Sequence, residues 1–124
     1  MTFTVVVADD DADIRQLVSI AVGRAGLNLL ASAADGAAAL AAIREHKPDL
    51  AILDVAMPEM SGLDVVREVR QDDAFADLRI LLLSASVDEA SREVGIEAGA
   101  NYFLAKPFSP RDLTAWLAIG KEAR

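Results

Sequence analysis

Short apolar segments alternate with longer segments of helical periodicity along the chain. Runs rich in β-branched and aliphatic residues predict strands at residues 3–8, 27–31, 50–53, 79–83 and 102–105. These runs are apolar at consecutive positions, which indicates strands buried on both faces. Strands of this kind, each followed by a helical segment, predict an α/β fold in which helices cover both faces of a parallel sheet.

Amphipathic helices are predicted between the strands. In residues 11–24, Ile14, Leu17, Val18 and Ala21 recur at spacings of three and four, which places them on one face of a helix. The same period occurs in residues 37–45, 63–69 and 113–117. Helix boundaries are indicated by Gly26 and Pro48 after the first two helices, and by Ser61-Gly62, Asp88 and Ser109-Pro110 before the last three. The Ala-rich residues 35–42 favour a helix that lies flat on the sheet.

Composition narrows the class of protein. A chain of 124 residues that is 53% apolar fits one globular domain, spanning residues 1–124. Its net charge of −8 and the lack of a basic cluster argue against binding to nucleic acid or to an anionic membrane, so we expect a protein partner or a small ion. Without cysteine there is no disulfide or thiolate metal site. We expect neither a signal peptide nor a membrane span, and a cytoplasmic location.

Polar residues follow four of the predicted strands. They are Asp9, Asp10 and Asp11 after the first strand, Asp54 after the third, Ser84 after the fourth and Lys106 after the fifth. In doubly wound sheets, ligands bind outside the carboxyl ends of the strands. We therefore expect these side chains to meet at one edge of the sheet.

Two explanations fit the aspartates after the first strand. Asp is favoured at the N-cap and first turn of a helix, and this explains Asp11 and Asp13. Asp9 and Asp10 precede the helix and are expected beside Asp54. Two carboxylates about 4 Å apart repel by roughly 4 kcal/mol at an effective dielectric constant of about 20, and a divalent cation would remove that repulsion. Oxygen ligands in this number suit Mg²⁺, for which Mn²⁺ could substitute.

The other polar residues suit a phosphoryl group. A lysine before a proline is commonly a surface residue, and a serine often ends a strand. At this edge, however, Lys106 could neutralise a phosphoryl oxygen and Ser84 could hydrogen-bond one. Asp54 could accept the phosphoryl group itself, since aspartate is a nucleophile in aspartyl-phosphate chemistry.

Four segments together resemble the receiver domain of bacterial two-component response regulators. They are Asp9-Asp10, DVAMPEMSG from Asp54 to Gly62, LLLSAS from Leu81 to Ser86 and GANYFLAKPF from Gly99 to Phe108. The spacings from Asp54 to Ser84 and to Lys106 match as well, and the resemblance covers essentially the whole chain. It implies a flavodoxin-like (βα)5 three-layer sandwich in the strand order 2-1-3-4-5, which is the family's known order and not one worked out from spacing.

The resemblance also implies a role for each site residue. Asp54 would be the phosphoacceptor, Asp10 a direct Mg²⁺ ligand and Asp9 a ligand through water, with Asp54 and the backbone carbonyl of Ala56 completing the metal sphere. Ser84 and Lys106 would each contact a phosphoryl oxygen, and Pro107 would follow a cis peptide bond. The phosphoryl group would come from a histidine kinase or a histidine phosphotransfer protein. This implies a signalling phosphoacceptor and not an enzyme.

The resemblance further implies a switch. Ser84 would move toward the phosphoryl group and Phe103, where many relatives carry Tyr, would fill the vacated space. The output face would comprise the fourth helix, the fifth strand and the fifth helix. There, Tyr102 and Trp116 replace the Asp and Arg of the DNA-binding subfamily. Either the two rings pack against neighbouring side chains, or they form a patch for a protein partner.

Two other functions compete with this one. Phosphatases of the haloacid dehalogenase type use a similar set of residues, and Asp9-x-Asp11 superficially matches their nucleophile motif. Ala12-Asp13 then lacks the usual Thr or Ser, and the chain leaves no room for a cap over a substrate. A degenerate receiver that only binds partners is the second rival, although the acids, the acceptor and the lysine are all retained.

Overall fold

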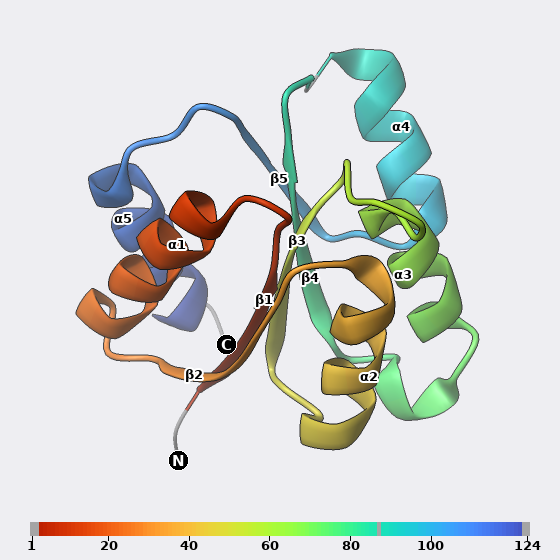
Figure 1. Ribbon diagram of the computed structural model, residues 1–124, viewed down its shortest axis with the longest axis horizontal. Helices are drawn as coiled ribbons and strands as arrows, with labels where there is room; N and C mark the ends of the chain where they lie inside the picture. The colour runs from red at the N-terminus through yellow and green to blue at the C-terminus, as the bar shows by residue number, and fades with distance from the viewer. Residues whose placement is uncertain (1–2, 87, 123–124) are drawn as a thin grey trace.

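The computed structural model describes residues 3–86 and 88–122 and contains every predicted strand. The strands are β1 (Thr4–Ala8), β2 (Asn28–Ala33), β3 (Leu50–Asp54), β4 (Arg79–Ser84) and β5 (Tyr102–Ala105). They form one parallel sheet in the order β2-β1-β3-β4-β5 (Figure 1). The flavodoxin-like α/β architecture and its strand order are therefore confirmed.

Helices cover both faces of the sheet, as predicted. They are α1 (Ala12–Arg24), α2 (Gly36–His46), α3 (Gly62–Arg70), α4 (Glu89–Ala98) and α5 (Pro110–Glu122). Figure 1 shows α1 and α5 on one face and α2, α3 and α4 on the other. Because side chains alternate along a strand, Val5 and Val7 pack toward α1 and α5, while Val6 and Ala8 pack toward α2 and α3. Two buried cores result, one on each side of the sheet.

Polar caps fix where the helices begin. Asp11 is the N-cap of α1 and accepts a hydrogen bond from the Asp13 amide, so the capping role expected for Asp11 is confirmed. Ser61 and Asp64 form a reciprocal capping box at the start of α3. Asp88 caps α4 by accepting from the Ser91 amide at 2.8 Å. The starts predicted for α3 and α4 are thus confirmed.

Local features around β2 and β4 differ from the prediction. Strand β2 continues to Ala33, and the pairing register of β1 with β2 shifts between Val5 and Val6. A short 3₁₀ helix, Asp73–Phe75, lies before β4. These features depend on backbone hydrogen bonds at the ends of helices and strands, and hydrophobic periodicity does not predict such bonds. The boundary predicted at Pro48 is confirmed, since helix α2 ends at His46 and its C-cap, Lys47, has a φ of 47° and donates its amide hydrogen to the carbonyl of Ile43.

An arginine at the end of α3 bonds to two connecting segments at the edge of the sheet opposite the polar strand ends. The guanidinium of Arg70 donates to the carbonyls of Gly99 at 2.9 Å, Phe75 at 2.7 Å and Leu78 at 2.7 Å, and to Oδ1 of Asn101 at 2.9 Å. Burial lowers the pKa of Arg70. Arg70 thus ties the end of α3 to the segments that lead into β4 and β5.

None of the helices in the part of the chain that the structure describes is long and apolar enough to span a bilayer.

Candidate functional site

The carboxyl ends of the strands bring the predicted acids and the predicted lysine together. Asp9 directly follows β1, Asp54 is the last residue of β3, and Lys106 directly follows β5. The Lys106 ammonium lies 2.9 Å from Oδ2 of Asp9 and 3.2 Å from Oδ1 of Asp54. Asp9 is fully buried and Asp54 is 4% exposed, so two carboxylates share one ammonium group in a site largely shielded from water.

Backbone contacts hold Lys106 and Asp9 in place. The Lys106 amide donates to the carbonyl of Ser84 at 2.8 Å, and the following Lys106–Pro107 peptide bond is cis, as the resemblance implied. Oδ1 of Asp9 accepts from the Asp11 amide at 2.9 Å. The carbonyl of Asp9 accepts from Nη1 of Arg15, on α1, at 2.7 Å. Asp9 is therefore fixed from both the turn and the helix that follow it.

A third carboxylate completes an oxygen-only cluster. Asp9, Asp10 and Asp54 each offer an oxygen atom, and these atoms lie within 4.8 Å of one another. Asp10 is exposed, so the cluster opens to solvent on its side. Oδ2 of Asp9 is buried and accepts no hydrogen bond in the structure. It contacts the Lys106 ammonium as an ion pair. Such a donor set fits Mg²⁺, which takes carboxylate oxygens and keeps several waters.

The carboxylates affect one another electrostatically. Burial raises the pKa of Asp54, and the charge of Asp9 raises it further, while Lys106 and the Ala56 amide oppose the rise. That amide donates to Oδ1 of Asp54 at 3.3 Å. Burial alone would lower the pKa of Lys106, but its close contacts with the carboxylates of Asp9 and Asp54 raise it overall. The site thus holds excess negative charge that one ammonium only partly compensates. The metal-ligand role of the Ala56 carbonyl stays a prediction.

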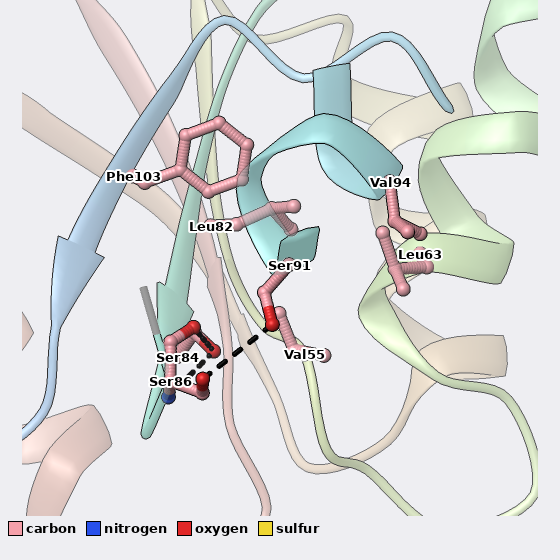
Figure 2. Close-up of a pocket in the computed structure, with 8 residues that line it drawn as sticks. All are labelled: Val55, Leu63, Leu82, Ser84, Ser86, Ser91, Val94 and Phe103. Atoms are coloured by element: carbon pink, nitrogen blue, oxygen red, sulfur yellow. Dashed lines mark hydrogen bonds between the residues drawn. The ribbon is translucent and has the colours of Figure 1, made fainter. Parts of the chain in front are cut away.

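Ser84 and Phe103, the two switch candidates, line one cavity beside this cluster. It measures about 160 Å³ and lies between β4, α3 and α4 (Figure 2). Ser84 donates its hydroxyl proton to the carbonyl of Ser86 at 2.6 Å. Phe103 packs against α4, where a Cβ at Gly95 would overlap its ring, and the guanidinium carbon of Arg92 lies 5.4 Å from the ring centroid. Their movement on phosphorylation stays a prediction.

Tyr102 and Trp116 contact each other. Their rings meet edge to face, with centroids 5.1 Å apart and an interplanar angle of 78°. The hydroxyl of Tyr102 accepts from Nη1 of Arg79 at 3.2 Å, and both rings pack on the core beneath α1 and α5. The alternative in which the rings pack against neighbouring side chains is confirmed. Their use as a docking patch stays a prediction.

Sequence reasoning missed two sets of contacts at the site. One is the bond from Arg15 to the Asp9 carbonyl. The other is a chain of hydrogen bonds through Ser86, Asp88 and Ser91 in the turn between β4 and α4. The spacing of Ser, Asp and Ser around a helix start was the available signal, because such residues bond to nearby backbone groups in turns and caps.

A family model described as the response regulator receiver domain matches residues 5–118 of the chain. The chain belongs to the response regulator receiver family. Receiver domains of this family bind Mg²⁺ at an acidic pocket, and the cluster of Asp9, Asp10 and Asp54 lies at the corresponding strand ends of this receiver. Membership also sets aside the haloacid dehalogenase-type phosphatase, since receivers are signalling domains of two-component systems.

Curated relatives of this receiver include longer regulators. It is 38% identical over 114 residues to the phosphate regulon transcriptional regulatory protein PhoB of Pseudomonas aeruginosa, covering 92% of this chain and 49% of that protein. It is 38% identical over 111 residues to the DNA-binding response regulator MtrA of Mycobacterium tuberculosis, covering 90% and 47%. The chain thus spans about half the length of these relatives.

Solved receivers share its fold along nearly the whole chain. The chemotaxis response regulator CheY4 of Vibrio cholerae superposes with a TM-score of 0.88 at 35% identity, covering 94% of this chain and 97% of that one. A putative response regulator from Chloroflexus aurantiacus gives a TM-score of 0.88 at 35% identity and covers 100% of both chains.

Proposed function

We propose that this receiver accepts a phosphoryl group on Asp54 from the phosphohistidine of a histidine kinase or a histidine phosphotransfer protein. The supporting observation is the position of the Lys106 ammonium, 2.9 Å from Asp9 and 3.2 Å from Asp54 at the sheet edge. That arrangement offers a buried carboxylate as acceptor, a fixed cation for the transferred oxygens and a second carboxylate for a metal. The proposal places the receiver in the cytoplasm together with such a donor.

The transfer is a displacement at phosphorus. An oxygen of ionised Asp54 forms the new P–O bond while the P–N bond of the donor breaks, and the electron pair of that bond stays on the imidazole nitrogen. The charge of Lys106 lowers the pKa of Asp54 against the rise caused by burial and by Asp9, which favours the ionised form of the acceptor, and Lys106 neutralises a phosphoryl oxygen after transfer. Ser84 donates a hydrogen bond to another phosphoryl oxygen once its hydroxyl is released from Ser86.

A metal ion bound at the acidic cluster would assist the phosphoryl transfer. Asp9, Asp10, Asp54 and the Ala56 carbonyl would hold Mg²⁺, or Mn²⁺ in its place, and the ion would neutralise charge on the phosphoryl oxygens.

Hydrolysis of the phosphorylated Asp54 ends the signal. Water attacks phosphorus, the Asp54 carboxylate leaves with the electron pair of the P–O bond, and inorganic phosphate is released.

Mass spectrometry after incubation with acetyl phosphate and Mg²⁺ tests the acceptor. The wild-type receiver should gain about 80 Da at Asp54, the mass of one phosphoryl group, and Asp54→Asn should gain nothing. A wild-type chain that takes up no phosphoryl group, but whose partner affinity equals that of Asp54→Asn, would instead be a degenerate receiver that acts only by binding.

Output through protein contact is the second part of the proposal. The relatives PhoB and MtrA are named as transcriptional or DNA-binding regulators, but the net charge of −8 on this receiver disfavours direct contact with nucleic acid. We assign output to the face formed by α4, β5 and α5, which carries Tyr102 and Trp116. A pull-down with phosphorylated and unphosphorylated receiver should recover a protein whose binding is lost in the Tyr102→Ala, Trp116→Ala double variant. Unchanged capture would remove these two rings from the output face.

A further inference from the structure

The turn between β1 and α1 carries two of the three acids of the cluster, and the first of them is fixed in place. The amide of Asp9 donates to the carbonyl of Ala33 on β2 at 3.1 Å, and its Oδ1 accepts from the Asp11 amide at 2.9 Å. Its Oδ2 lies 2.9 Å from the Lys106 ammonium, and the whole residue is buried. Asp9 is therefore held at its amide and at both carboxylate oxygens.

The side chain of Asp10 has no such support. It is exposed, and within residues 3–86 and 88–122 its carboxylate has no hydrogen-bond or ion-pair partner. One of its oxygens nevertheless lies within 4.8 Å of oxygens of Asp9 and Asp54. Like charges at this distance repel, so the side chain alone does not explain why Asp10 stays at the cluster. Its direction is therefore set by the backbone that carries it.

Arg15, near the start of α1, holds that backbone. Its Nη1 donates to the carbonyl oxygen of Asp9 at 2.7 Å, which is a short hydrogen bond from a charged donor. Its amide donates to the carbonyl of Asp11 in the same turn at 3.1 Å. The Asp9 carbonyl and the Asp10 amide belong to one planar peptide unit. A donor that fixes this carbonyl therefore also fixes the plane from which the Asp10 side chain departs.

Charge alone would give Arg15 the opposite effect on a metal ion. A guanidinium beside the acids repels a divalent cation, so a role as counter-charge predicts that removal of Arg15 strengthens Mg²⁺ binding. A role in holding the peptide between Asp9 and Asp10 predicts weaker binding, because the exposed carboxylate is then free to turn away from the cluster. The two roles thus differ in the sign of the change in Mg²⁺ affinity.

We infer that Arg15 is a positioning residue for the metal site. By holding the Asp9 carbonyl, Arg15 directs the exposed carboxylate of Asp10 toward Asp9 and Asp54, where a divalent cation can bind all three acids. The affinity for the metal then depends on a side chain whose hydrogen bond goes to the backbone and not to the ion. The inference rests on the proposed phosphoacceptor function and adds a residue on which its metal site depends.

Isothermal titration with Mg²⁺ alone, without a phosphodonor, tests the inference. Arg15→Met keeps an aliphatic side chain and loses the donors, so we expect it to bind Mg²⁺ about tenfold more weakly than the wild type, a change typical of residues that orient metal ligands. Arg24→Met is the matched control, since Arg24 is exposed in the last turn of α1 and its loss changes the net charge equally. It should bind Mg²⁺ at least as tightly as the wild type. Binding by Arg15→Met that equals or exceeds that of Arg24→Met would overturn the inference.

A double variant shows whether Arg15 acts through Asp10. In Asp10→Asn the carboxylate that Arg15 directs is gone, so adding Arg15→Met should weaken the remaining Mg²⁺ binding by less than about twofold. A loss of about tenfold in both backgrounds would indicate a general distortion of the turn, and Arg15 would then not be a positioning residue for Asp10.

Arg15→Lys separates the hydrogen bond from the charge. Its ammonium keeps the charge but is more strongly hydrated and lacks the planar donor geometry, so its Mg²⁺ affinity should lie between those of the wild type and Arg15→Met. Should Arg15→Met fail to fold, wild-type affinity in Arg15→Lys would overturn the inference, and a loss that disappears in the Asp10→Asn background would support it.

Labelling by acetyl phosphate distinguishes failure of the inference from failure of the proposed function. If the wild type gains a phosphoryl group while Arg15→Met keeps wild-type Mg²⁺ affinity, the inference is wrong and the phosphoacceptor function stands. If the wild type takes up neither Mg²⁺ nor a phosphoryl group, the proposed function fails and the inference fails with it.

Discussion

We expect Lys106 to compete with a bound metal ion for the carboxylates of Asp9 and Asp54. Its ammonium contacts Asp9 at 2.9 Å and Asp54 at 3.2 Å, and both acids are buried. Lys106→Met removes that positive charge and leaves the repulsion between the acids uncompensated. We expect Mg²⁺ to bind about tenfold more tightly to Lys106→Met, a change of about 1.4 kcal/mol, in isothermal titration. Labelling by acetyl phosphate should fall at the same time, because a phosphoryl oxygen loses its fixed cation.

Lys47→Met is the matched control for this prediction. Lys47 lies at the end of α2, where its backbone caps the helix, and it takes no part in the acidic cluster. The net charge changes equally in both variants, so any general effect of charge on Mg²⁺ affinity appears in both. Equal Mg²⁺ affinities in the two variants would contradict the competition between Lys106 and the metal.

The acidic cluster could be predicted from the sequence, whereas the serine turn could not. Asp9, Asp54 and Lys106 lie at one edge because parallel strands end at the same edge of the sheet, which the alternation of strands and helices predicts, while the strand order that makes β1 and β3 neighbours came from the family resemblance. The bond from Ser86 to Asp88 depends on the conformation of a short turn, and several turns suit the same residues. Likewise, the reach of Arg15 back to the Asp9 carbonyl depends on a side-chain rotamer that sequence spacing does not fix.

At the scale of secondary-structure elements, the side chain of Arg70 joins the end of α3 to the segments that lead into β4 and β5. Its guanidinium bonds to the carbonyls of Gly99, Phe75 and Leu78 and to Asn101. Arg70→Met leaves these oxygens without their charged donor, so we expect the free energy of unfolding to fall by about 2–4 kcal/mol in urea denaturation. Arg70→Lys keeps the charge but loses the planar fork, and it should recover less than half of the loss. Arg67→Met, which removes an exposed ion pair with Asp64, should change stability by less than about 0.5 kcal/mol.

Arg70 lies at the edge of the sheet opposite the acidic cluster, so its loss should leave the proposed phosphoryl transfer intact. Folded Arg70→Met should still gain one phosphoryl group from acetyl phosphate. A variant with wild-type stability would show that the hydrogen bonds of Arg70 contribute no net free energy. The helix that carries Arg70 was predictable from its apolar stripe, but the hydrogen bonds of Arg70 were not. Periodicity reports which side chains are buried and says nothing of which carbonyls at a loop need a donor.

At the scale of the whole molecule, strand order came from the family resemblance and helix placement from physical rules. The alternation of elements predicts helices on both faces, and the structure places α1 and α5 on one face and α2, α3 and α4 on the other (Figure 1). Nothing in the spacing of the strands alone chooses the order β2-β1-β3-β4-β5 over other parallel orders. This order places β1 and β3 side by side, and their adjacency brings the carboxylates of Asp9 and Asp54 together.

Metal binding should therefore stabilise the whole fold. A ligand that binds only the folded state at 100 times its dissociation constant adds about 2.7 kcal/mol to the free energy of unfolding. We expect a gain of this size for the wild type with Mg²⁺ in urea denaturation, and most of it should be lost in Asp10→Asn, whose exposed carboxylate serves the cluster and not the core. Because the net charge is −8, salt alone also stabilises the chain by screening self-repulsion, so NaCl at equal ionic strength is the required reference. If Mg²⁺ stabilised Asp10→Asn as much as the wild type beyond that reference, the ion would be acting elsewhere on the acidic surface and not at the ends of β1 and β3.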